Sequence, residues 1–469
     1  MLINHKNGKS EQKTVAVLGA GPAGLAAATK LAAGGYKVCI FDERPDIGGL
    51  CASIKYGDFI FDFGGHRFYP DNEKVLDEIK KIAPSDLVVR KRNSSIFIRR
   101  KFVAYPLRLG NLLFNMSPVI LFAAMLEYMG RSVKNMVLPL KEKTLKDWLL
   151  NRFGRVLYDI YFKPYTEKFW GLSIDDISVE WASSRITLVG FWDVMLRLFS
   201  RKKSVPATYI KEYFYPDLGI GAIFEKMGRE IENNGGEINL CNKIRNVYVN
   251  NGTAQKILIE KDGEETLLKC DYVISTVPLP ELVSMLEPQL EAEYQNMAGT
   301  VKYRAMLFVF LIINRESISG NNWVYFPEDD YVFSRITEPK NWSARMAPKD
   351  KTSLCVEIPL NTDDDLWNMD DSLVMEEVAA GLSKAGFLER NEIVDYFTQK
   401  WRYSYPVYTG DYRKTVDSLM LRLSDIGNLA LAGRQGRFVY ATATDAMKMG
   451  FDAAEEAERY FDADNGRRV

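Results

Sequence analysis

The sequence has little histidine, few cysteines and no excess of charge. Only two histidines, His5 and His66, occur in 469 residues, which excludes a histidine-rich metal site. The five cysteines form no CxxC pair and are odd in number, so we expect neither a zinc site nor a disulfide framework, but a reduced cytoplasmic protein. The formal net charge of −1 and the pI of about 6.3 indicate no affinity for nucleic acid.

Long apolar runs are also missing. The first 13 residues are polar and lack the apolar core of a signal peptide. The most apolar stretch, 112–126, is interrupted by Asn115, Ser117 and Pro118, and it is too short to cross a bilayer. We therefore expect no integral membrane segment. We interpret 112–126 as part of a buried helix pair, with a contact to a membrane surface as the alternative.

The most informative stretch that is present lies near the N-terminus. An apolar run, 15–18, leads into Gly19-x-Gly21-x-x-Gly24 and an Ala-rich segment, and a second apolar run ends at Asp42. This order predicts a strand–helix–strand dinucleotide-binding unit, in which the glycines allow a tight turn, close approach of a pyrophosphate and close helix–strand packing. Asp42 would accept hydrogen bonds from ribose hydroxyls.

The residues after Asp42 distinguish FAD from NAD. Gly48 and Gly49 follow six and seven positions later, and FDFGGHRFYP (61–70) comes soon after. An NAD domain would continue into a further strand–helix–strand crossover, whereas 50–70 reads as short β segments separated by glycines. The Asp-x5-Gly-Gly continuation resembles the FAD-binding amine oxidase superfamily, which implies FAD as the cofactor.

The predicted fold class is α/β with α+β insertions, and 469 residues allow two or three hydrophobic cores. We expect a Rossmann-like FAD/NAD(P)-binding domain that is discontinuous, formed by 12–75, 205–280 and 425–469. Residues 76–204 are mostly helical by pattern, and 281–424 are expected to form an antiparallel-sheet substrate domain. Strands are predicted at 271–278, 301–314, 323–337, 353–360 and 428–432, and helices at 219–232, 370–386 and 444–460.

Further motifs resemble the UDP-galactopyranose mutases, especially the eukaryotic type, and the protoporphyrinogen-oxidase-like oxidoreductases. In chain order they are GGHRF (64–68), FVAYPL (102–107), YFKPYTEKFWG (161–171), SVEWASSRI (178–186), FYPDLGIGAIFEKM (214–227), WVYFPEDDYVFSRITEPKNWS (323–343), SYPVY (404–408) and GRQGRFVY (433–440). The resemblance extends from Val15 to about Glu456. The order of these motifs along the chain is specific for this group of proteins, and less specific for one reaction.

The resemblance implies site residues. His66, Arg185 and Arg335 are the candidate catalytic residues, with His66 beside the flavin ring and the two arginines on the diphosphate of a sugar nucleotide. The expected cofactor-binding residues are Gly19, Gly21, Gly24, Asp42, Gly48, Gly49, Gly64, Gly65, Gly433 and Arg434. The expected substrate-binding residues are Tyr105, Phe162, Thr166, Trp170, Arg185, Arg335, Tyr405 and Tyr440. The alternative is that the arginines pair with carboxylates or lie at the surface, and that the aromatic residues belong to the core.

Two reactions are compatible with this reading. As a sugar-nucleotide mutase, the enzyme would use reduced flavin N5 to attack the anomeric carbon, so that no protein base is prominent. As an oxidoreductase, it would pass a hydride from a small or lipid-like substrate to oxidised flavin. The segment YATATDAMKMG (440–450) lacks the amide and histidine of many relatives, and Thr166 stands where the mutases have an asparagine, so the base or sugar can differ. We expect a small-molecule substrate; a homo-oligomer is compatible with the sequence.

Overall fold

The computed structural model describes residues 12–68, 72–84, 86–105, 117–137, 142, 144–181 and 212–467. Its first unit is the predicted strand–helix–strand motif, in which β1 (Thr14–Leu18) pairs in parallel with β2 (Lys37–Phe41) and α1 (Pro22–Ala33) connects them. Both strands are buried after their first residue. This burial on both faces explains their continuous apolar runs.

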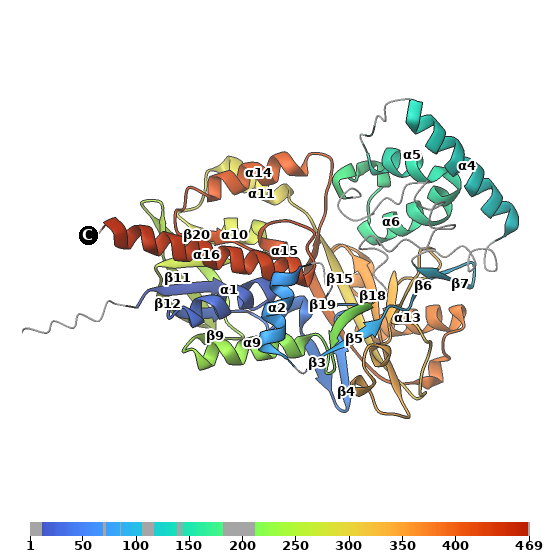
Figure 1. The fold of residues 1–469 in the computed structure, drawn as a ribbon, viewed down its shortest axis with the longest axis horizontal. Coiled ribbons are helices and arrows are strands. Elements are labelled where there is room, and N and C mark those ends of the chain that lie inside the picture. The colour runs from blue at the N-terminus through green and yellow to red at the C-terminus, as the bar shows by residue number, and fades with distance from the viewer. Residues whose placement is uncertain are drawn as a thin grey trace, which may run out of the picture.

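The strand–helix–strand motif belongs to a five-stranded parallel sheet whose strands come from distant parts of the chain (Figure 1). The order is β20 (Leu429–Leu431), β13 (Tyr272–Ser275), β1, β2 and β9 (Glu237–Asn239). One face is covered by α1, α9 (Gly221–Asn233), α16 (Ala443–Arg467) and α2 (Glu73–Ile82). The other face is covered by α10 (Leu279–Met285), α11 (Ala292–Thr300), α14 (Tyr412–Leu423) and a sheet of β12 (Glu264–Lys269), β11 (Thr253–Lys261), β10 (Lys243–Asn250) and β14 (Leu286–Glu287).

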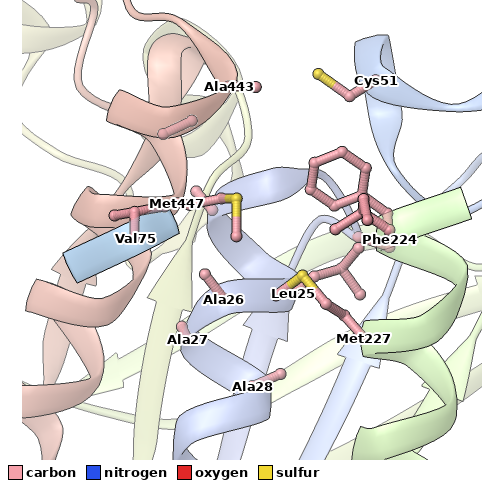
Figure 2. Packing of buried hydrophobic residues seen from close by; sticks show 14 of the residues in the cluster. Leu25, Ala26, Ala27, Ala28, Cys51, Val75, Phe224, Met227, Ala443 and Met447 are labelled. Atoms are coloured by element: carbon pink, nitrogen blue, oxygen red, sulfur yellow. The ribbon is translucent and has the colours of Figure 1, made fainter. Parts of the chain in front are cut away.

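Small residues allow the helices of the first layer to approach closely. The alanines of α1 lie between Met447 of α16 and Met227 of α9 (Figure 2). A Cβ at Gly450 would lie 2.1 Å from the carbonyl oxygen of Ala23. The close contact of α16 with α1 therefore depends on glycine and alanine at the crossing.

A second, seven-stranded sheet forms the other half of the molecule. The order is β19 (Ile393–Pro406), β15 (Tyr303–Ile313), β18 (Thr352–Leu360), β17 (Arg335–Thr337), β16 (Trp323–Tyr325), β6 (Ser94–Ile98) and β7 (Lys101–Tyr105). All neighbouring strands are antiparallel except β16 and β6. The helix α13 (Asp371–Ala385) packs in the apolar core of one face, and the hairpin of β3 (Ser53–Tyr56) and β4 (Phe59–Asp62) packs on the other.

A helical segment stands beside this sheet, at the upper right of Figure 1. It consists of α4 (Pro118–Val137), α5 (Leu145–Leu157), a π-helical turn (Tyr158–Phe162) and α6 (Lys163–Trp170). Thr144 begins α5 with a reciprocal capping box that involves Asp147, and Gly171 ends α6 with a left-handed backbone. Within the described residues, no helix is both long and apolar enough to cross a membrane.

Two expectations differ from the structure. Residues 76–204 were expected to be mostly helical, but β5 (Leu87–Lys91), β6 and β7 are strands, and β5 pairs with β8 (Glu212–Pro216). The β6–β7 hairpin turns at Arg99 and Arg100, which have φ of 50° and 60° without the glycine or asparagine that would announce such a turn. The prediction of a buried helix pair at 112–126 is also wrong for residues 117–126, the part of the stretch that the structure describes. From Val119 to Leu126, α4 exposes several apolar side chains, whereas residues 112–116 lie outside the described residues.

Candidate active site

The glycine-rich turn after β1 has the geometry of a dinucleotide site. Gly19 has φ of 107°, and its amide donates to the carbonyl of Phe41 at 2.8 Å. A Cβ at Gly24 would lie 1.9 Å from the carbonyl oxygen of Gly19, so the helix can pack on the turn only with glycine there. A Cβ at Gly21, by contrast, would have no described atom within 4 Å. The space in front of Gly21 is therefore open for a ligand.

The second glycine pair lies against this turn. The amide of Gly48 donates to the carbonyl of Ala20 at 2.8 Å, and a Cβ at Gly49 would lie 3.3 Å from the Cα of Gly21. Both glycines have positive φ, of 102° and 56°. The helix α1 begins at Gly21 with no side-chain cap and no acidic residue in its first turn, so its free amides and positive dipole end suit a phosphate.

Asp42 lies at the end of β2, beside the glycine-rich turn. One carboxylate oxygen accepts from the amide of Ala20 at 2.7 Å, and the other accepts from the amide of Arg44 at 2.9 Å. Burial raises the pKa of Asp42, and these two amides oppose the shift. Each oxygen keeps a further acceptor site, so Asp42 can also bind ribose hydroxyls. The two glycine turns, the uncapped helix and this carboxylate fit the adenosine and pyrophosphate of FAD.

The predicted closing segment also lies on the first unit of the fold. Gly433 has φ of 80° and begins the short α15 (Gly433–Gly436), and a Cβ there would lie 3.1 Å from the Cβ of Ala23. Arg434 uses its guanidinium differently from what was expected. It donates to the carbonyls of Ala441, at 2.9 and 2.6 Å, and of Ser404, at 3.0 Å. Arg434 thus fixes two backbone segments of the site, and its direct contact with the cofactor stays a prediction.

His66 lies just beyond the Gly64–Gly65 turn, and both of its ring nitrogens have partners. Nε2 is 3.0 Å from the carbonyl oxygen of Phe63, so it must be the nitrogen that donates, and Nδ1 then accepts from the Cys51 thiol at 3.6 Å. Burial, and after it the charges of Arg434 and Arg335, lower the pKa of His66 to about 3. The ring is therefore neutral and is not arranged to transfer a proton. Its predicted position beside the flavin remains a prediction.

Arg335 is held by a buried carboxylate. It stands opposite Glu357 in the register of β17 and β18, and the Glu357 side chain accepts from both Nε and Nη2 of Arg335. Glu357 is 2% exposed, and a Cβ at Gly64 would lie 2.6 Å from one of its oxygens. Although burial acts against the charged form, Glu357 raises the pKa of Arg335 well above its usual value. Among the described residues, Nη1 of Arg335 has no hydrogen-bond partner.

Tyrosine rings surround the two arginines. Tyr405 and Tyr440 stack with centroids 5.3 Å apart, and the guanidinium of Arg434 lies over them at 4.6 and 5.5 Å. Arg335 lies 5.9 Å from the ring of Tyr325. The predicted residues Tyr405, Tyr440 and Arg335 therefore come together. In sequence they are far apart, because Arg335 begins β17, Tyr405 lies near the end of β19 and Tyr440 follows α15.

One face of the π-helical turn and α6 adds a row of aromatic rings. Tyr161 and Tyr165 stack at 5.8 Å, and Tyr165 and Phe169 stack at 6.0 Å. The row reaches Tyr405, whose ring is 5.2 Å from that of Phe169. Tyr325 contacts Tyr165 at 5.7 Å and leads to the predicted residue Tyr105 at 5.6 Å. All of these side chains are partly accessible.

Three predicted substrate residues lie elsewhere on this helical segment. Thr166 and Trp170 are only 3% and 2% exposed, and Trp170 belongs to the apolar core that α6 shares with α5. Phe162 packs against Phe153, with ring centroids 4.6 Å apart. Thr166 and Trp170 are therefore less accessible than Tyr161, Tyr165 and Phe169. Arg185, the other predicted arginine, lies outside the described residues.

Two cations, buried Arg304 and partly buried Lys168, attach α6 to the seven-stranded sheet. Arg304 of β15 is 3% exposed and donates to the carbonyls of Lys168, at 3.3 Å, and of Phe169, at 2.9 Å, at the end of α6. Lys168 donates to the carbonyls of Phe326, at 3.0 Å, and of Glu328, at 2.8 Å. The aromatic row is thus held in a fixed relation to Tyr325 and Arg335.

Sequence reasoning missed several of these residues. The row Tyr161, Tyr165, Phe169 was visible as aromatics spaced by four in YFKPYTEKFWG, a spacing that places them on one helical face. Glu357 gave no such signal, because an isolated glutamate in the apolar run TSLCVEIPL is not tied by any pattern to an arginine on another strand. Cys51 gave none either.

The comparisons with known proteins agree with this fold. A protein from Klebsiella pneumoniae described as a probable UDP-galactopyranose mutase is 27% identical over 172 residues, which are 35% of this chain and 43% of that protein, so the match spans less than half of the relative's length. The crystal structure of a reduced UDP-galactopyranose mutase superposes with a TM-score of 0.82 at 20% identity, covering 96% of this chain and 94% of that one. A structure from Exiguobacterium named as a putative protoporphyrinogen oxidase gives a TM-score of 0.73 at 17% identity, covering 96% and 99%.

At these identities the two structures show a shared fold and not a shared reaction. The family model described as flavin containing amine oxidoreductase matches residues 22–457, which is most of the chain. The match begins at the first helix of the dinucleotide turn and ends within α16, so it includes both halves of the site. The chain therefore belongs to the flavin containing amine oxidoreductase family and is an FAD-dependent enzyme.

Proposed function

We propose that the enzyme is a sugar-nucleotide mutase that acts with reduced flavin. The observation that carries this proposal is the arrangement of Arg335. Glu357 holds one edge of the guanidinium, and the N–H groups of Nη1, which have no partner among the described residues, remain for an anion. A guanidinium that is oriented before the ligand arrives loses little side-chain entropy on binding, which favours a diphosphate.

The neighbouring tyrosines support an anionic ligand at the same place. Burial raises the pKa of Tyr405 to about 12, so its hydroxyl stays protonated and can donate a hydrogen bond to a phosphate oxygen. Tyr440 stacks on Tyr405 and would present a second hydroxyl. The rings of Tyr165 and Phe169 provide apolar walls for a base or a sugar.

Reduced flavin, when bound, would supply the nucleophile for the anomeric carbon of the sugar. The protein's part is to bind the diphosphate, to orient the sugar and to stabilise the charge that develops on the departing phosphate. Neutral His66, with both nitrogens engaged, would serve as a fixed dipole in this arrangement and not as a general base. Arg185 is proposed as the second phosphate ligand on the basis of the sequence resemblance alone.

The test is to incubate the dithionite-reduced, FAD-loaded protein with UDP-hexopyranoses and to search for a furanose isomer by chromatography and NMR. Conversion that requires reduced flavin supports the proposal. Conversion is expected to fall in an Arg335→Ala variant, with flavin content unchanged, but not in Arg390→Ala. Arg390 is a matched control because it also pairs with a glutamate, Glu376, on the exposed surface.

A second function is favoured by one specific observation. Glu357 balances the charge of Arg335, and the row Tyr161, Tyr165, Phe169 is mostly apolar, which would suit a hydride donor that is uncharged or lipid-like. An oxidoreductase of this kind would bleach oxidised flavin anaerobically on addition of substrate. If UDP does not bind to the protein and Arg335→Ala changes nothing in the mutase assay, this second function replaces the first.

A further inference from the structure

Two turns of the cofactor half meet through the side chains of Cys51 and His66. Cys51 ends the short helical turn that follows the second glycine pair, and its amide donates to the carbonyl of Gly48 at 2.9 Å. His66 follows the next glycine turn along the chain. The hairpin of β3 and β4 connects the two turns and pairs Ser53 with Asp62, so the chain returns to the level of Cys51. This register brings Cys51 and His66 together although 15 positions separate them.

The Cys51 thiol is the side-chain partner of the His66 imidazole. Its sulfur lies 3.6 Å from Nδ1, and Nε2 lies 3.0 Å from the carbonyl oxygen of Phe63. Because a carbonyl only accepts, Nε2 carries the proton of the neutral ring, and Nδ1 is left as an acceptor that needs a donor. Among the described residues, no group other than the thiol hydrogen-bonds to Nδ1. The orientation of the ring therefore depends on one backbone carbonyl and one thiol.

The pair does not have the properties of a nucleophilic cysteine and its base. A nucleophilic cysteine is a thiolate in an electropositive and partly exposed place. Cys51 is 4% exposed, and burial raises the pKa of its thiol to about 12, although the charge of Arg434 acts in the opposite direction. Burial, and after it the charges of Arg434, Arg335 and Arg67, lower the pKa of His66. The thiol therefore stays protonated and donates, and the neutral imidazole accepts.

The surroundings of the two turns show what the thiol adds. The cations near the ring are Arg434, Arg335 and Arg67, and the nearest carboxylates are Asp62, close to Cys51, and Glu357, beside the Gly64 backbone. Glu357 is already paired with Arg335. Without the thiol, Nδ1 would be a buried acceptor with no partner, and such a nitrogen is free to take up a proton. A donor that already occupies the lone pair of Nδ1 prevents this.

We propose that Cys51 is a positioning residue of the flavin site. Its thiol holds His66 as the Nε2–H tautomer in one orientation and keeps Nδ1 from taking up a proton when the flavin is reduced. The proposal rests on the predicted place of His66 beside the flavin. It does not depend on the choice between a mutase and an oxidoreductase, because both would use the same flavin site.

The first measurement is NMR of the full-length, FAD-loaded protein labelled with ¹⁵N in its histidines. Only His5 and His66 give ring signals, and His66→Gln assigns them. In the wild type we expect a protonated Nε2 and an unprotonated Nδ1 that accepts a hydrogen bond. In Cys51→Ala the Nδ1 signal should move downfield, toward that of a nitrogen without a donor. Cys51→Ser keeps a donor, so its Nδ1 signal should stay close to that of the wild type.

The second measurement is the midpoint potential of the bound FAD as a function of pH. In Cys51→Ala the potential should become more positive and more dependent on pH, because Nδ1 is then free to take up a proton that compensates the charge of the reduced flavin. Cys270→Ala is the matched control. Cys270 is also a buried free cysteine, 8% exposed, and it lies in the core on the other face of the five-stranded sheet. This control should leave the His66 signals and the potential unchanged.

Two results would overturn the proposal. One is an Nδ1 signal in Cys51→Ala that equals the signal of the wild type, because another donor would then hold the ring. The other is a midpoint potential that is the same in Cys51→Ala and Cys270→Ala, because the ring would then not act on the flavin. Neither measurement uses a sugar nucleotide, so failure of this proposal is distinguishable from failure of the mutase proposal.

Discussion

Replacing Gly21 by valine should remove FAD and leave the folded protein intact. Gly21 has φ of −78° and ψ of −179°, an extended backbone that valine adopts readily, and a Cβ there meets no described atom within 4 Å. The free energy of unfolding of the apoprotein should therefore change by less than about 1 kcal/mol. The side chain would occupy the space in which a pyrophosphate approaches the turn. Losing one or two amide bonds to the phosphates, at about 1.5–3 kcal/mol each, weakens FAD binding by roughly tenfold to ten-thousandfold.

Gly24→Ala provides the contrasting variant. Its Cβ would lie 1.9 Å from the carbonyl oxygen of Gly19, so helix and strand must move apart, at a cost of about 3 kcal/mol or more. The assays are flavin absorbance of the purified proteins, titration of the apoproteins with FAD, and denaturant unfolding of the apoproteins. We expect Gly21→Val to lose the cofactor and Gly24→Ala to lose stability. A Gly21→Val protein with a full flavin spectrum and unchanged FAD affinity would refute the assignment of this turn.

Three further predictions follow from buried ionisable groups. Arg335→Ala should weaken UDP binding by about 1.5–3 kcal/mol. It should also destabilise the fold by about 3–5 kcal/mol, because Glu357 loses its partner. In the double variant Arg335→Ala/Glu357→Gln, denaturant unfolding should show that stability is recovered, and calorimetry should show that UDP binding is not. Restored UDP affinity would contradict this. His66, with a pKa of about 3, should show no titration by NMR between about pH 5 and 8, and the stability it contributes is full above its unfolded pKa and falls below it; a midpoint near 6.5 would contradict its neutral state. Burial raises the pKa of Asp62 to about 6 from 3.8, so its contribution to stability is full below about pH 4 and is lost as pH rises through about 6. In Asp62→Asn, the free energy of unfolding should therefore depend less on pH in that window. An unchanged pH profile would assign the pH dependence to other groups.

Local sequence patterns determined the cofactor half of the molecule. The turn from Gly19 to Gly24, Asp42 and the pair Gly48–Gly49 lie within one stretch of chain, and each acts through its own backbone conformation or through its immediate neighbours. Such features are readable because glycine is required by a positive φ or by a close approach, whatever the rest of the chain does. The strand at 272–275 and the helix from 443 were likewise predictable, since a short apolar run that ends at a proline indicates a buried strand and an amphipathic helix carries its own periodicity.

The substrate half depended on the tertiary structure. Glu357 became the partner of Arg335 only because β17 and β18 pair in one register, and a shift by one residue would have placed the two side chains on opposite faces of the sheet. The sequence also did not show which side of α6 stays accessible. Arg304 and Lys168 decide that by attaching the helix to the sheet, so that Tyr165 is accessible and Thr166 is buried.

The same reason explains α4. Its composition allowed either a buried helix or a helix at the surface. Apolar residues favour burial, but they do not show which surface they are buried against. The contact between Glu127 and the break at Gly154 settles the orientation of the helix and leaves its apolar side outward. The sequence by itself determined the dinucleotide turn and the secondary structure around it, since these depend on neighbours along the chain. The partner of Arg335, the neighbours of the aromatic row and the outward side of α4 depend on residues that only folding brings together.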